Sequence, residues 1–245
     1  MTTARATSWV SNEKDRDERL RHAERLVGLS ISAVRYFDID YGRFEREIKE
    51  PGPRVIADEA GWVSPSWRYD VADSFAFGLE LETDGGRVFS VTWDPPGGIE
   101  GIGIREESLI GNTLLPGAKT AVWDVGERSR WHHHLGDPVS AVTMHYAPWD
   151  IDAGAWWCNR ITILIGATVV ELLLAEVAFE TKRIAPSADE VLTRITDHTP
   201  QRRIRFGTSD HRLSAPAMTQ INSSVTDSPI SETAGYRHFP NGSVG

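Results

Sequence analysis

The chain has 245 residues, enough to bury a substantial core in one large domain or two small ones without disulfide bonds or structural metals. Its single cysteine, Cys158, cannot form an internal disulfide bond, which excludes the class of small disulfide-stabilised secreted proteins. The formal net charge is −9, and the eight basic and six acidic residues of segment 182–245 leave −11 on residues 1–181, so this acidic body disfavours binding to a phosphate backbone.

The N-terminal region predicts a helix over residues 13–27. Asn12 is suited to cap its first turn, apolar residues recur at helical spacing, and Gly28 stands where helices commonly end. A strand is expected next, from Leu29 to Phe37, because apolar residues alternate there with serines. Prolines and glycines interrupt residues 38–74, where we expect loops and one or two short strands.

Two stretches share one design, which is an apolar strand, a tight turn with glycine, and a second apolar strand. They are residues 75–93, with the turn Asp84-Gly85-Gly86, and residues 160–179, with Gly166. Each predicts a β-hairpin with one buried face. The second stretch is nearly apolar enough for a membrane span, but its glycine, its β-branched residues and its two carboxylates indicate strands. The likeness of the two stretches leaves an internal duplication open, although hairpins in general share these features.

Further strands are expected around these hairpins. The Pro-Pro-Gly-Gly sequence at residues 95–98 must end the first hairpin, because consecutive prolines supply no N–H groups for a sheet. Residues 99–105 can then return as a third strand, and residues 139–146 alternate like another.

Two more helices are predicted from capping signals. Residues 124–136, DVGERSRWHHHLG, combine a capping-box spacing of Asp124 and Glu127 with a glycine at the expected exit. A second capping box at residues 187–190 predicts a short helix that continues to Ile195.

These elements predict a mainly β protein of the α+β kind. We expect an antiparallel β-sandwich or bent sheet of seven to ten strands with two or three peripheral helices. Residues 1–12 are expected to be a flexible N-terminus and residues 13–198 a single β-rich domain. Residues 199–245 are expected to be a disordered tail, basic at first and then rich in Ser, Thr and Pro, because such a segment buries too little apolar surface to offset its ordering entropy.

Three adjacent histidines, His132 to His134, are the most suggestive metal ligands in the chain. On the predicted helix the first and third lie about 200° apart and cannot hold one ion together. The positions four residues further along are Gly136 and Pro138, which are not ligands. We therefore expect no metal site, and no sequence pattern indicates a cofactor.

Two pairs of carboxylates could support acid–base catalysis, namely Glu80 with Glu82, and Asp94 with Glu100. Strand alternation favours a simpler interpretation for the first pair, which is the solvated face of a half-buried strand. Nucleophile-elbow and nucleotide-binding glycine motifs are absent from the sequence, and Cys158 fits a small buried hydrophobic residue. The catalytic residues, if the protein is an enzyme, stay unassigned.

Nine tryptophans are the unusual component of this composition. Trp149, Trp156 and Trp157 cluster around one predicted connection between strands, and Asp94 ends the first hairpin. Indole rings with one apolar and one solvated end are enriched at binding surfaces, and loops on rigid scaffolds often carry function. We predict that these four residues contribute to a binding surface.

We therefore expect a non-enzymatic binding or adaptor module, for example of the immunity type, that recognises a protein partner through an acidic, Trp-bearing surface. The N-terminus shows no apolar block of the secretory kind, and we expect a cytoplasmic protein without membrane association. One alternative is a hydrolase or carbohydrate-active enzyme that uses Asp, Glu and His from loops. Another is a nucleic-acid accessory protein acting through Arg202-Arg203-Ile204-Arg205, although the acidic body argues against nucleic acid. A small-molecule ligand is also compatible with the sequence.

Overall fold

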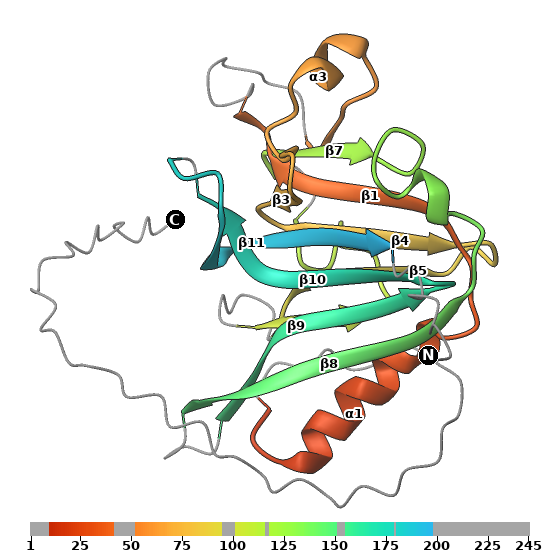
Figure 1. The fold of residues 1–245 in the computed structure, drawn as a ribbon, viewed down its shortest axis with the longest axis vertical. Coiled ribbons are helices and arrows are strands. Elements are labelled where there is room, and N and C mark those ends of the chain that lie inside the picture. The colour runs from red at the N-terminus through yellow and green to blue at the C-terminus, as the bar shows by residue number, and fades with distance from the viewer. Residues whose placement is uncertain are drawn as a thin grey trace, which may run out of the picture. The chain divides into compact units, whose positions relative to one another are not determined.

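The computed structural model describes residues 10–41, 52–94, 101–115, 118–150, 155–178 and 180–197. These residues form a mainly β structure of two sheets with a few short helices, which confirms the predicted fold class (Figure 1). The eleven strands of the described ranges exceed the expected seven to ten by one. The predicted tail, residues 199–245, lies outside the described residues, as does most of the predicted N-terminal segment.

The first sheet has six strands in the order β2-β7-β1-β4-β5-β6. Its strands are β1 (Ile31–Ile39), β2 (Arg54–Val55), β4 (Gly78–Thr83), β5 (Val88–Trp93), β6 (Ile102–Arg105) and β7 (Thr120–Asp124). Neighbouring strands are antiparallel, except that β2 and β7 are parallel.

The second sheet has five antiparallel strands in the order β3-β11-β10-β9-β8. They are β3 (Asp73–Phe75), β8 (Val139–Asp150), β9 (Ala155–Ile165), β10 (Thr168–Val177) and β11 (Ile184–Asp197). The helices are α1 (Glu13–Ala23) and α3 (Glu59–Val63), with short 3-10 turns η1 (Glu24–Leu26) and η2 (His132–His134).

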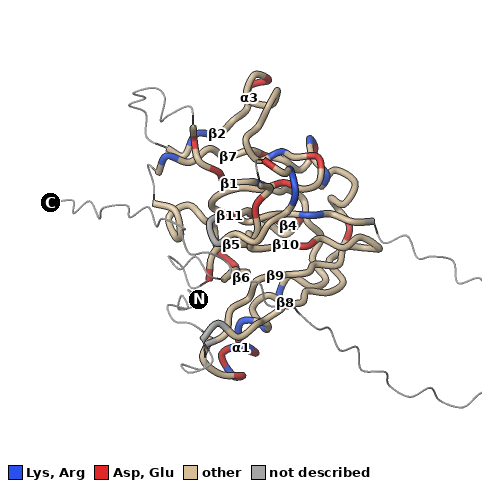
Figure 2. Tube along the Cα trace, turned by 60° about the vertical axis from the view of Figure 1, so that its left-hand side comes forward, with Lys and Arg blue, Asp and Glu red and all other residues tan. Residues whose placement is uncertain are grey.

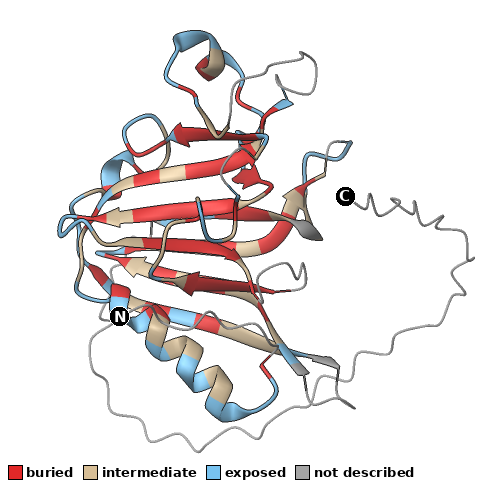
Figure 3. Cartoon of the chain, turned by 180° about the vertical axis from the view of Figure 1, so that it is seen from behind, coloured by how far each residue is buried: buried red, intermediate tan, exposed pale blue. Residues whose placement is uncertain are grey.

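One hydrophobic core joins the two sheets. Alternate side chains of β1 and β4, such as Val34 and Leu79, belong to the same buried cluster as Ile161 of β9 and Leu172 of β10. In Figure 3 buried residues accordingly run along the strands of both sheets, whereas α1 is mostly exposed or half-buried. This is the predicted sandwich, with each sheet placing one face against the other.

Both predicted hairpins are confirmed as β4–β5 and β9–β10. The first is shorter than expected, because Phe75 belongs to β3 in the other sheet and the hairpin begins at Gly78. The apolar stretch that resembled a membrane span is the β9–β10 hairpin. Within the described residues, no helix combines the length and the apolar character that crossing a bilayer requires.

The N-terminal helix is confirmed, and its ends follow local chemistry. The Asn12 side chain accepts a hydrogen bond from the Asp15 N–H at 3.0 Å, which caps the first turn. After η1, Gly28 adopts φ of +85°, a conformation that favours glycine.

The helix predicted at residues 124–136 is wrong. Asp124 ends β7, and only His132–His134 form a single 3-10 turn. Val125 and Trp131 are both fully buried, although on one helix two residues six positions apart would point about 120° away from each other. The indole N–H of Trp131 donates to the Tyr36 hydroxyl at 2.7 Å, so a tertiary contact overrides the capping signal.

The helix predicted at residues 187–195 is also wrong, because this segment lies in β11 and pairs with β10. Val191 and Leu192 are consecutive and fully buried in different hydrophobic clusters. A strand that is buried on both faces shows no alternation, so its sequence resembles that of a short buried helix.

Candidate binding site

Asp94, one of the predicted binding residues, lies between α1 and the first sheet. Its two carboxylate oxygens bind Arg19 of α1 and Arg105 of β6, each at 2.6 Å. The three side chains are only 8–13% exposed. The carboxylate of Asp94 therefore attaches the helix to the sheet and is turned away from solvent.

Two glycines, Gly103 in β6 and Gly101 directly before it, allow Asp94 to pack closely against this strand. A Cβ atom at Gly101 would lie 2.5 Å from the Asp94 carbonyl oxygen, and one at Gly103 would lie 2.9 Å from the Asp94 Cβ. Real Cβ atoms do not approach other atoms this closely, so both positions need glycine. Gly101 and Gly103 therefore serve the close packing of β6 against Asp94.

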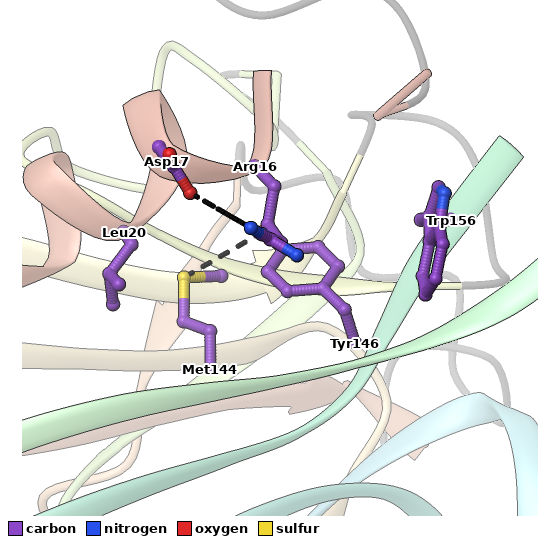
Figure 4. Close-up of a pocket in the computed structure, with 6 residues that line it drawn as sticks. All are labelled: Arg16, Asp17, Leu20, Met144, Tyr146 and Trp156. Atoms are coloured by element: carbon purple, nitrogen blue, oxygen red, sulfur yellow. Dashed lines mark hydrogen bonds and ion pairs between the residues drawn. The ribbon is translucent and has the colours of Figure 1, made fainter. Parts of the chain in front are cut away.

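With α1 held in this way, a groove of about 360 Å³ lies between α1 and the β8–β9 strands (Figure 4). We call it the α1–β8 groove. Its lining residues are Arg16, Asp17, Leu20, Met144, Tyr146 and Trp156. Figure 1 shows α1 running beside β8, and Figure 4 shows the side chains of the helix and of β8 directed toward one another. The volume lies within the range of ligand sites in proteins.

Trp156 is the most exposed of the hydrophobic residues that line this groove. It lies in β9 opposite Pro148 of β8 and is 38% exposed. A tryptophan exposed to this extent leaves apolar indole surface in water that a ligand could cover. Trp156 is thus the predicted binding residue that the structure places in an accessible position.

The groove floor is apolar and uncharged. The Tyr146 hydroxyl donates to the Met144 sulfur at 3.9 Å, and burial raises the pKa of Tyr146 well above its ordinary value. Burial likewise raises the pKa of the nearby Cys158 thiol to about 12. Both groups therefore stay neutral at physiological pH, and the thiol is not an activated nucleophile.

The rim of the groove carries one ion pair on α1. The Arg16 guanidinium nitrogen Nη2 lies 3.3 Å from Oδ1 of Asp17, and the two side chains are 39% and 57% exposed. Exposed pairs of this kind contribute little to stability, so either partner can turn to a ligand at low cost. Figure 2 shows that acidic and basic residues are interspersed along α1.

The other two predicted tryptophans do not join this surface in the described structure. The side chain of Trp149 lies outside the described residues, although its backbone belongs to β8. Trp157 is half-buried and packs against the main core. The predicted loop is therefore largely strand, and the groove depends on side chains of α1 that no sequence pattern marks as binding residues.

The prediction that Glu80 lies on the solvated face of its strand is wrong, because the side chain is buried. Its carboxylate is 2% exposed and accepts hydrogen bonds from Arg35 at 2.9 Å, the Ser108 hydroxyl at 2.7 Å and the Leu109 N–H at 2.8 Å. Residues 106–115 fold over this face of the first sheet, where Leu109 packs in a second hydrophobic cluster. Glu82, by contrast, remains 34% exposed. Glu100 lies outside the described residues.

The histidine run lies in η2, where the rings of His132 and His133 are 5.0 Å apart and His134 is buried. Across the described ranges, no group of three or more His, Cys, Asp or Glu side chains is placed to hold a metal ion.

Asp38 offers a test of the buried electrostatics. It accepts hydrogen bonds from the Ser66 hydroxyl at 2.5 Å and the Ala76 N–H at 3.0 Å, and burial raises its pKa. A raised folded-state pKa stabilises the fold below the unfolded pKa, and this contribution is lost as the pH rises through the folded pKa. Asp38→Asn should therefore become more stable relative to the wild type as the pH rises from about 4 to neutrality. Urea unfolding of both proteins across this range measures the difference, and a difference that is constant or falls with pH would contradict it.

The chain matches no protein-family model, and searches of curated proteins and of solved structures find no similar chain.

Proposed function

We propose that this protein is a binding module that recognises a protein partner through the α1–β8 groove. The observation that carries the proposal is the exposed indole of Trp156 in a groove that also offers apolar and charged side chains. Tryptophan and arginine are the residue types that most often dominate binding energy at protein interfaces. Leu20 and Met144 add apolar surface, and methionine adapts readily to different partners.

The charge of the chain supports a basic partner. Residues 198–245 carry five basic and three acidic residues, so a net charge of −11 remains on residues 1–197. A protein with this excess attracts basic partners and repels acidic ones over distances up to about 10 Å at moderate salt. A reducing compartment such as the cytoplasm suits the module, because its one thiol is buried and has no partner for a disulfide bond.

The proposal is tested by selecting peptides that bind the protein and then measuring their affinity for a variant that lacks the Trp156 indole. Peptides of twelve random residues displayed on phage would be selected against the full chain, and the best would be synthesised and its affinity measured by calorimetry. Trp156→Ala should weaken binding by at least about 30-fold, the size of a hot-spot residue. The side chain is partly exposed in the native fold, so the variant should keep the circular dichroism of the wild type.

Val63→Ala is the matched control, because Val63 is 83% exposed on α3 and does not line the groove. Its affinity for the peptide should equal that of the wild type. Selection that enriches no peptide, or peptides that bind Trp156→Ala as tightly as the wild type, would overturn the proposal.

A further inference from the structure

Strand β8 is the last strand of the second sheet, and most of its outer edge has no strand beside it among the described residues. Only its first residue is paired there, since the Val139 N–H donates to the Leu29 carbonyl at 2.9 Å and the Gly28 N–H donates to the Val139 carbonyl at 2.8 Å. An edge of this kind presents a row of N–H and C=O groups that another extended chain can bind.

The pair formed by Trp156 and Pro148 shows which backbone groups face the open edge. The Trp156 N–H donates to the Val10 carbonyl at 2.8 Å, on the side away from β8. Trp156 therefore does not exchange hydrogen bonds with Pro148, and the backbone of Pro148 points outward. The position suits proline, which lacks an N–H and is confined to sheet edges.

Successive residues of a strand direct their backbone N–H and C=O groups to opposite edges, and this alternation shows which other residues of β8 face the open edge. The extra residue of the bulge near Tyr146 lies in β9, so the alternation along β8 is not interrupted there. Every second residue back from Pro148 turns its backbone groups to the open edge, namely Tyr146, Met144 and Val142. Thr143 and His145 point toward β9 and are already paired.

Two residues of β8, Met144 and Tyr146, belong both to the open edge and to the α1–β8 groove. Met144 and Tyr146 offer their backbone groups to the open edge, while their side chains line the α1–β8 groove. A strand placed beside β8 would have its residues opposite Met144 and Tyr146 on the same face of the sheet as these side chains. An extended segment could thus pair with the edge and fill the groove at once.

We propose that the partner contributes an extended segment that adds to the second sheet as a strand beside β8, along Val142 to Tyr146. This proposal rests on the proposed function and names its mode of recognition. The main-chain hydrogen bonds would supply affinity, and the groove would select alternate side chains of the segment.

The lining and the charge define the chemistry of this segment. Leu20, Met144 and Trp156 favour apolar side chains at every second position, and the acidic chain favours a basic partner. The stretch from Ala141 to Ala147 contains no Lys, Glu or Asp, the residues that commonly guard free edges against pairing. A second copy is a poor occupant, because pairing two β8 edges would bring together two bodies that each carry −11 on residues 1–197.

Amide hydrogen exchange by NMR tests the assignment residue by residue. Addition of the selected synthetic peptide to the full chain should slow exchange of the amides of Val142, Met144 and Tyr146 by at least about tenfold. Thr143 and His145 are internal controls, since their amides already bond to β9 and should change little. Unchanged exchange at the three outward amides would overturn strand addition.

A second experiment changes the peptide and leaves the protein intact. Methylation of one backbone nitrogen at a time should weaken binding by about tenfold or more at alternate peptide positions, and by far less at those between. Uniform tolerance of methylation would overturn strand addition while leaving the proposed function in place, provided that Trp156→Ala still weakens binding by at least about 30-fold. If instead every selected peptide bound Trp156→Ala as tightly as the wild type, the proposed function itself would be overturned. Protection of the three amides that grows with protein concentration alone would identify a second copy as the occupant and overturn the proposal.

Discussion

Replacing Asp94 with alanine is expected to lower the free energy of unfolding by about 3–5 kcal/mol. The carboxylate is the shared partner of Arg19 and Arg105, whose side chains are each 13% exposed. Removing it leaves two largely buried cations without this partner, and the cost of such a charge is much larger than the net contribution of the pair. Chemical denaturation with fluorescence or circular dichroism measures the change.

Asp17→Ala provides the control for Asp94, since it also removes an aspartate that binds an arginine. The Arg16–Asp17 pair is exposed, and its loss should cost less than about 1 kcal/mol. Asp94→Asn, which keeps the shape and one acceptor oxygen, should fall between these two variants. A loss below about 1 kcal/mol for Asp94→Ala would show that α1 is held by other contacts.

The second large effect is expected for Glu80→Ala, which should cost about 3 kcal/mol or more. The substitution removes the acceptor of the buried Leu109 N–H and the buried partner of Arg35. Residues 106–115, which cover this face of the first sheet, should lose protection from hydrogen exchange before the rest of the sheet does. Denaturation gives the free energy, and exchange monitored by NMR gives its location.

Glu82→Ala is a closely matched control, because Glu82 lies on the same strand and also binds Arg35. Its side chain is 34% exposed, so its loss should cost less than about 1 kcal/mol. Equal costs for the two variants would mean that burial of Glu80 does not decide its contribution.

The parts of the fold that the sequence predicted correctly are those whose signals are local and agree with one another. In β4–β5 and β9–β10, apolar residues surround a turn containing glycine, so strand period and turn chemistry indicate the same structure. In α1, the Asn12 cap and Gly28 mark both ends of the helical region independently of tertiary contacts.

The errors arose where capping signals stood without a matching hydrophobic period. Asp124 and Glu127 have the spacing of a capping box, but Asp124 is the last residue of strand β7, and the fully buried Trp131 donates its indole N–H to Tyr36 of β1. Capping contributes about 1 kcal/mol, whereas burial of one large aromatic side chain contributes more. A capping signal therefore does not determine the local structure where burial of a large side chain favours another conformation.

The candidate site was only partly predictable for a related reason. Trp156 could be singled out by residue type, but its groove partners on α1 lie about 140 positions earlier in the chain. Residues 13–19 of the helix are all charged, so the sequence does not tell which of these side chains meet β8. Glu80 was misplaced because its covering segment begins 26 residues later and carries no strand or helix signal.

The attachment of α1 has a consequence for how tightly the groove can bind. The helix has a single fully buried residue, Ala23, yet it supplies one wall of the groove. Molecules in which the helix has lifted from the sheet lack that wall, so the apparent affinity equals the intrinsic affinity multiplied by the docked fraction. The salt bridge of Asp94 thereby sets the population of the binding-competent state, and a ligand that fills the groove would in turn hold the helix in place.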